Sequence, residues 1–102
     1  YYYYYYYYNI NHIIKKLNLK PNQKVLDIGS GWGHLALEIA KQSKCEVLGI
    51  TLSENQLQYS LEKVRELNLE NHVSFKLLDY RELNEKFDNT FTFIMDFVFT
   101  NN

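Results

Sequence analysis

The chain is short, nearly neutral in charge and poor in cysteine. It has 102 residues, with 11 basic and 12 acidic side chains and one cysteine, Cys45. This length allows one domain at most, the charge balance does not suggest a nucleic-acid-binding protein, and a single cysteine excludes an internal disulfide.

The chain begins with a low-complexity run of tyrosines at residues 1–8. The run has no periodicity that assigns it to a helix or to a one-sided strand, and no chemistry calls for so many adjacent phenols. We therefore expect residues 1–9 to lie outside the fold, and residues 10–102 to form a single, partial cofactor-binding domain.

Residues 25–36, VLDIGSGWGHLA, join an apolar strand to a helix through a glycine-rich turn. Glycine is needed at Gly29, Gly31 and Gly33, because a tight strand-to-helix turn requires unusual dihedral angles and a Cβ would hold the backbone away from a ligand. The helix that opens near His34 then directs free N–H groups at a nucleotide-type cofactor. The dinucleotide fingerprint has its third glycine one position later, so the spacing favours S-adenosylmethionine (SAM) over NAD.

A second strand is predicted at residues 45–52, CEVLGITL, and a helix follows it directly. Ser53 followed three residues later by Gln56 is a capping box, which predicts the start of this helix. The helix is expected to end near residues 67–69 and to bury three apolar side chains that recur at i, i+4 and i+7. These side chains are Leu57, Leu61 and Val64.

A third strand is predicted at residues 73–78, VSFKLL, and residues 79–81 close it. The order β-α-β-α-β predicts an α/β fold with a parallel sheet and right-handed crossovers. Ligands of such sheets bind beyond the carboxyl ends of the strands. Residues 27–33, 51–56 and 79–81 are therefore expected to rim one crevice.

The glycine turn and the end of the second strand together resemble those of a known family. The most specific features are GWG at residues 31–33 and GITLSENQ at residues 49–56, and the similarity extends over residues 19–88. The chain resembles the cyclopropane-fatty-acyl-phospholipid synthases and mycolic acid cyclopropane synthases, which are class I SAM-dependent methyltransferases. The resemblance implies a truncated Rossmann-like sheet of order 3-2-1-4, and transfer of a methylene group from SAM to the cis double bond of a phospholipid acyl chain.

The same resemblance implies a set of cofactor-binding residues. They are Asp27, Gly29, Gly31, Gly33, Thr51, Leu52, Gln56, Asp79, Tyr80 and Arg81. Thr51 and Gln56 would hold the ribose hydroxyls in place of the usual strand-end acid. Asp27 would face the methionine ammonium group, while Tyr80 and Arg81 would border the adenine. Two alternatives stay open: Gln56 only caps its helix, or Tyr80 only packs under a loop.

Two further residues of the turn allow alternative roles. Trp32 either shields the cofactor or packs on the following helix. His34 either approaches the methionine carboxylate or faces solvent. The histidines of the chain lack metal-ligand spacing, so we expect no metal site.

Several lysines gather near the first strand, at Lys15, Lys16, Lys20 and Lys24. They either make a peripheral membrane contact with anionic headgroups or form a solvated helix face. No apolar segment approaches the roughly 18 residues of a membrane span, and we expect a cytoplasmic protein.

No catalytic residue is assigned. The resemblance implies that the family's bicarbonate-binding cysteine precedes the first strand, and that its acidic and histidine partners follow the fourth. After Asp88 the chain reads NTFTFIMDFVFTNN, without the family's glutamate-histidine pair, and this segment is predicted to be an exposed edge strand. We expect a truncated cyclopropane synthase. The alternatives are an inactive remnant or a SAM-binding fragment that needs a partner chain, and a generic small-molecule methyltransferase.

Overall fold

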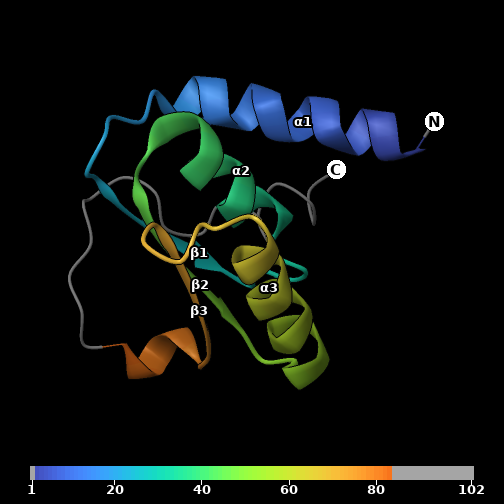
Figure 1. Cartoon of the computed structure of the whole chain (residues 1–102), viewed down its shortest axis with the longest axis vertical. Coiled ribbons are helices and arrows are strands. Elements are labelled where there is room, and N and C mark those ends of the chain that lie inside the picture. Colours follow the sequence, from blue (N-terminus) through green and yellow to red (C-terminus); the bar gives the residue numbers. More distant parts are fainter. Residues whose placement is uncertain (1, 84–102) are drawn as a thin grey trace.

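Helices alternate with parallel strands in residues 2–83, the part of the chain that the computed structural model describes, with side chains from Ile10 onward. The elements are α1 (Tyr2–Leu17), β1 (Lys24–Ile28), α2 (His34–Ser43), β2 (Glu46–Thr51), α3 (Glu54–Glu66), β3 (Val73–Leu77) and a 3₁₀ turn, η1 (Tyr80–Glu82) (Figure 1). The predicted β-α-β-α-β order is confirmed. The strand predicted after Asp88 lies outside the described residues.

The sheet has the order β1-β2-β3, and both pairs of neighbouring strands are parallel. This agrees with the 3-2-1 part of the predicted order. Asp27 lies opposite Gly49, and Gly49 lies opposite Phe75, so these three residues form one row across the sheet. Because the strands run in the same direction, their carboxyl ends share one edge, where a ligand is expected.

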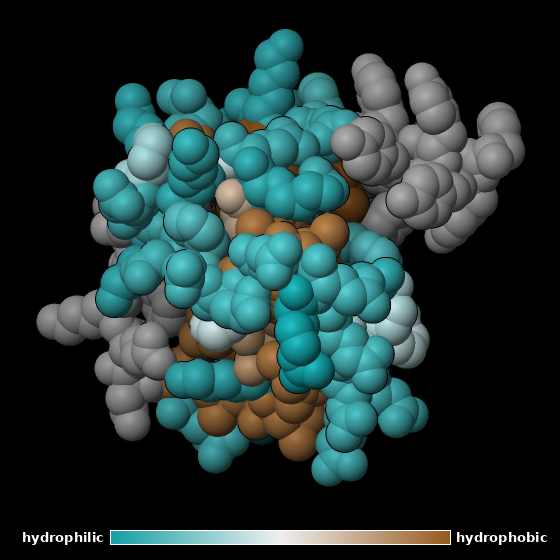
Figure 2. Space-filling view, in the orientation of Figure 1, coloured by the Kyte–Doolittle hydropathy of each residue, from teal (hydrophilic) through white to brown (hydrophobic). Residues whose placement is uncertain are grey.

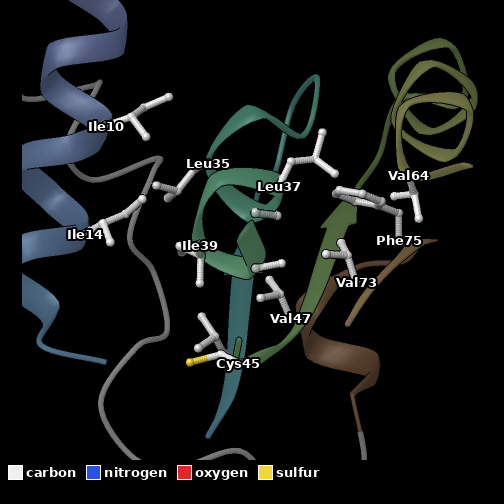
Figure 3. Packing of buried hydrophobic residues seen from close by; sticks show 13 residues of the cluster. Ile10, Ile14, Leu35, Leu37, Ile39, Cys45, Val47, Val64, Val73 and Phe75 are labelled. Atoms are coloured by element: carbon white, nitrogen blue, oxygen red, sulfur yellow. The ribbon is translucent and has the colours of Figure 1, made fainter. Parts of the chain in front are cut away.

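The larger hydrophobic core lies between the sheet and the helices (Figure 3). Val25, Val47 and Val73 form one row of the sheet and pack in the same cluster as Leu35 and Ile39 of α2. Burial of each such side chain stabilises the fold by about 1.5–3 kcal/mol. The helices are therefore packed on this face of the sheet. This packing fixes α2 and α3 relative to the carboxyl ends of the strands.

The opposite face of the sheet carries a smaller apolar cluster. Successive side chains of a strand point to opposite faces, so Leu26 and Leu48 lie on the other side of the sheet from Val25 and Val47. Ile50 completes this second cluster. Both faces of the central strand are thus apolar, which is typical of a parallel sheet.

Helix α1 includes most of the tyrosine run, which the sequence did not assign to a helix. It begins at Tyr2 and ends at Leu17. Ile10 and Ile14, one helical turn apart, are buried in the core. The packing of these two residues stabilises the first helical turn, which is the costly step in helix formation. Extension of the helix then adds one hydrogen bond for each further residue, so a run of tyrosines, with ordinary helix propensity, can be included. The expectation that residues 1–9 lie outside the packed domain stays a prediction.

The buried face of α3 differs from the predicted one. Leu57 is partly buried and Val64 is buried, as expected, but Leu61 is 39% exposed and Ser60 is wholly buried in its place. The reason is the approach of α3 to the glycine turn, because an atom placed at the Cβ position of Gly33 would lie 2.7 Å from Ser60 Oγ. A leucine side chain would not fit at that distance.

The helices in residues 2–83 are either too short or too polar to cross a membrane. Each of the lysines near the first strand is exposed: Lys15, Lys16, Lys20 and Lys24. Their contact with anionic headgroups stays a prediction, as does the cytoplasmic location.

Candidate cofactor-binding site

A pocket of about 340 Å³ lies where the three strands end. Its lining combines the end of each strand with the loop that follows: Ile28, Gly29, Ile50, Thr51, Leu52, Leu78, Asp79, Tyr80 and Arg81. Hydrophobic side chains also gather along the lower edge of the molecule in Figure 2, where Figure 1 shows β2 and β3 ending. Six of the predicted site residues line this pocket, so the expected convergence of the three strand ends is confirmed.

Two apolar lining residues, Ile50 and Leu78, lie outside the predicted rim, and a third, Ile28, lies within it without an assigned role. Ile28, Ile50 and Leu78 lie at or just after the ends of their strands and supply much of the apolar wall. The position of each at a carboxyl strand end was the signal that could have identified them, since such residues border a ligand in this class of sheet. Together with Leu52 they form a surface suited to a flat, weakly polar group such as a purine.

The glycine turn after β1 has two different faces. Gly29, Gly31 and Gly33 all have positive φ angles, of 70°, 59° and 87°. A Cβ at Gly31 would meet nothing within 4 Å, so this side of the backbone is open to a ligand. A Cβ at Gly33 would lie 2.9 Å from the Phe75 ring and closer still to Ser60. Gly31 therefore fits the predicted role of letting a ligand approach the backbone. Gly33 is needed for packing instead, because a larger residue would collide with Ser60 and Phe75.

Backbone hydrogen bonds hold the glycine turn against the sheet. The Ser30 N–H donates to the Ile50 carbonyl at 2.9 Å, and the Gly33 N–H donates to the Ser30 carbonyl at 3.0 Å. Helix α2 then begins at His34 without a side-chain cap at Gly33. The N-terminus of α2 lies at this turn, where the helix dipole favours an anionic group such as a carboxylate.

Polar side chains are buried beside this turn. Within the described residues the buried polar set is Asp27, Ser30, Thr51 and Ser60. Asp27 has no exposed surface and lies on the helix-covered face, in one row with Gly49 and Phe75. It does not line the pocket, and its contact with a methionine ammonium group stays a prediction.

The segment after β2 is organised by three side-chain hydrogen bonds. The Ser53 hydroxyl accepts from the Gln56 N–H at 3.2 Å and caps α3, as predicted. The Gln56 side chain does not complete the capping box. Its Oε1 atom instead accepts from the Thr51 hydroxyl at 3.1 Å, and the Ser53 N–H donates to that same hydroxyl at 3.1 Å. The structure therefore argues against the alternative in which Gln56 only caps its helix.

The segment after β3 is closed by an ion pair. Arg81 Nη2 lies 2.6 Å from Asp79 Oδ2, and Arg81 Nε lies 3.0 Å from Asp79 Oδ1. These bonds and the Arg81 backbone N–H hold the pKa of Asp79 at about 2, below its ordinary value of 3.8. Tyr80 lies between them in sequence, lines the pocket and is 51% exposed. Its ring is therefore not packed under a loop.

Replacing Arg81 by alanine is expected to raise the pKa of Asp79 toward its ordinary value. A depressed carboxylate pKa stabilises the folded state above pH 4, and this contribution is lost as the pH falls through about 2. The variant should lack that part of the acid dependence between pH 4 and 2. The Asp79 carboxyl carbon, followed by NMR in the wild type and in Arg81→Ala, reports the pKa directly. The exposed Arg65 of α3 provides the control variant, Arg65→Ala, and equal pKa values in all three proteins would contradict the role of Arg81.

Trp32 and His34 both lie close to Tyr59 of α3. The Trp32 ring meets the Tyr59 ring edge-on with centroids 5.4 Å apart, and Lys63 Nζ lies 5.6 Å from the centroid of the same tyrosine ring. His34 lies 6.3 Å from that ring. Partial burial and the charge of Lys63 lower the pKa of His34 below its ordinary value of 6.5, which favours the neutral imidazole.

The chain is similar to known proteins over most of its length. The family model described as mycolic acid cyclopropane synthetase matches residues 6–99. The cyclopropane-fatty-acyl-phospholipid synthase of Escherichia coli strain K12 is 43% identical over 76 residues, which are 74% of this chain and 19% of that protein. The chain thus spans about a fifth of the length of that relative.

Solved structures of two methyltransferase-like enzymes superpose well on the chain. The cyclopropane synthase MmaA2 of Mycobacterium tuberculosis gives a TM-score of 0.72 at 31% identity, over 78% of this chain and 28% of that one. Coclaurine N-methyltransferase, solved with N-methylheliamine and SAH bound, gives 0.71 at 34% identity, over 78% of this chain and 24% of that one. Each similarity covers more than three quarters of this chain and less than a third of the other enzyme.

Proposed function

The chain belongs to the mycolic acid cyclopropane synthetase family, and from this premise we propose that its pocket binds SAM for methylene transfer to an unsaturated phospholipid acyl chain. The fold is the α/β, Rossmann-like methyltransferase fold, truncated relative to its relatives. One observation carries the cofactor part of the proposal. Residues at or just after the end of each of the three strands line one pocket, and Gly29 of the glycine turn is among them.

The residues of the pocket fit the chemistry of SAM. The apolar wall formed by Ile28, Ile50 and Leu52, with the exposed ring of Tyr80, suits an adenine. Thr51, which lines the pocket, and its hydrogen-bond partner Gln56 supply polar groups suited to a ribose diol, and the N-terminus of α2 suits the methionine carboxylate. When bound, SAM supplies an electrophilic methyl group on a sulfonium ion.

The acceptor part of the proposal depends on relatives. The Escherichia coli relative is named as a synthase of cyclopropane fatty acyl phospholipids, which favours an unsaturated acyl chain. A second candidate, a small-molecule methyltransferase, is supported by the similarity to coclaurine N-methyltransferase, which was solved with N-methylheliamine. The SAM-binding part is shared by both, so they differ only in the acceptor.

Calorimetric titration of the 102-residue chain tests the cofactor proposal. Saturable binding of SAM with one site per chain is expected, and no binding of NAD, because the third glycine of the dinucleotide fingerprint is displaced. NAD binding, or no SAM binding by a chain shown to be folded by circular dichroism, would contradict the assignment.

A labelling experiment separates the acceptors. The chain is incubated with SAM labelled in its methyl group and with vesicles of an unsaturated phospholipid. Label in the lipid fraction supports a cyclopropane synthase. SAM binding without label transfer to lipid or to an amine such as heliamine supports the SAM-binding fragment that needs a partner chain.

A further inference from the structure

The glycine turn is held by backbone hydrogen bonds at its two ends. The Ser30 N–H donates to the Ile50 carbonyl, and the Gly33 N–H donates to the Ser30 carbonyl. Gly31 and Trp32 lie between these bonds, and Gly31 has a positive φ of 59° and an open Cβ side. Because glycine has more backbone freedom than any other residue, the side chains next to it determine how firmly this part of the turn is held.

One side chain of α3, Tyr59, contacts the residues on both sides of Gly33. The Trp32 ring meets the Tyr59 ring at a centroid distance of 5.4 Å and an interplanar angle of 84°, and the His34 ring lies at 6.3 Å and 65°. Both geometries are those of favourable edge-to-face aromatic pairs. Lys63 Nζ lies 5.6 Å from the centroid of the same tyrosine ring, which is within the range of a cation–π contact.

The residue that follows in α3, Ser60, packs against Gly33 itself. Its Oγ atom lies 2.7 Å from the position that a Cβ of Gly33 would take. Tyr59 and Ser60 together therefore meet residues 32–34, three consecutive positions after the turn opens. Helix α3 begins just after Thr51, which lines the pocket, so one helix connects the glycine turn with the pocket wall at the end of β2.

We propose that Tyr59 is a positioning residue, whose ring holds Trp32, and with it the glycine turn, in the conformation that receives the cofactor before the cofactor binds. This role rests on the proposed SAM site and deepens it. Tyr59 is not among the described residues that line the pocket, so it acts through the turn and not by touching the cofactor. A turn that is already ordered does not have to be ordered at the expense of binding free energy.

Substitution of Tyr59 by leucine tests this role, because leucine removes the aromatic ring and is a strong helix former. SAM affinity measured by calorimetry is expected to fall about fivefold, in line with the loss of one edge-to-face pair. Tyr59→Phe keeps the ring and should bind within about twofold of the wild type. The exposed neighbour on α3 provides the control variant, Gln58→Leu, with wild-type affinity. Equal affinities of Tyr59→Leu and Tyr59→Phe would overturn the proposal.

The fluorescence of Trp32 reports on the turn without any cofactor, because it is the only tryptophan of the chain. Trp32 is 46% exposed, and exposed side chains change rotamer within picoseconds to nanoseconds unless a contact holds them. The anisotropy decay of Trp32 should therefore lack a fast local component in the free wild type and in Tyr59→Phe, and should gain one in Tyr59→Leu. Fast local motion in the free wild type would overturn the proposal, even if Tyr59→Leu fails to fold.

The two measurements separate failure of this inference from failure of the SAM proposal. Wild-type SAM affinity in a folded Tyr59→Leu variant whose Trp32 has become mobile would overturn the positioning role, because order in the turn would then add nothing to binding. Absence of SAM binding by the folded wild type would overturn the proposed function instead. The contact between Tyr59 and Trp32 would still be established by the anisotropy decay.

Discussion

Substitution of Gly31 by alanine is expected to abolish SAM binding while the chain remains folded. The added methyl group would meet no protein atom within 4 Å, so it would not disturb the core. It would instead project from the open side of the turn, where the backbone must come close to the cofactor. The positive φ of 59° costs an alanine about 1–2 kcal/mol, a moderate fraction of the stability of a small domain.

Two measurements check the effect of Gly31→Ala. Calorimetric titration should show SAM affinity reduced by about a hundredfold or more, in line with the loss of close backbone approach and about 3 kcal/mol of binding free energy. Urea unfolding should show that the free energy of unfolding falls by no more than about 1–2 kcal/mol, the cost of one alanine in the left-handed region. Wild-type affinity in a variant of reduced stability would show that this side of the turn does not face the cofactor.

Substitution of Gly33 by alanine, unlike that of Gly31, is expected to act mainly on the stability of the fold and to lower it strongly. Its added Cβ would lie 2.7 Å from Ser60 Oγ and 2.9 Å from the Phe75 ring, and its φ of 87° adds backbone strain. Overpacking and strain together predict a loss of about 2–5 kcal/mol in the free energy of unfolding. The upper end of this range equals the whole stability of a marginal domain, which is about 5 kcal/mol.

A double substitution identifies the cause of the Gly33→Ala effect. Removing the Ser60 hydroxyl in Gly33→Ala/Ser60→Ala relieves the shorter of the two contacts, so urea unfolding should recover part of the lost stability. The single variant Ser60→Ala provides the reference. Additive effects of the two substitutions, or a Gly33→Ala stability equal to that of Gly31→Ala, would argue that the turn does not pack on α3 as described.

Several features of the protein follow from short stretches of sequence. The glycine turn, the strand before it, the helix after it and the Ser53 cap depend on residues that are close in the chain, and the structure confirms them. The meeting of the strand ends at one pocket follows from a general rule, since parallel strands joined by helices must end at the same edge. The choice of SAM over NAD comes from the spacing of the glycines and stays a proposal for this chain.

Other features were decided only when the elements packed together. Apolar periodicity narrowed the buried face of α3 to one side, but the close approach of Gly33 and Phe75 selected the small Ser60 over Leu61. The partner of the Gln56 side chain was decided in the same way. The capping pattern allowed the Ser53 backbone, and the fixed end of β2 supplied the Thr51 hydroxyl instead. In each case the sequence limits which residues can be buried or can form a hydrogen bond. The distances between the packed elements then determine which of these residues are buried and which hydrogen bonds form.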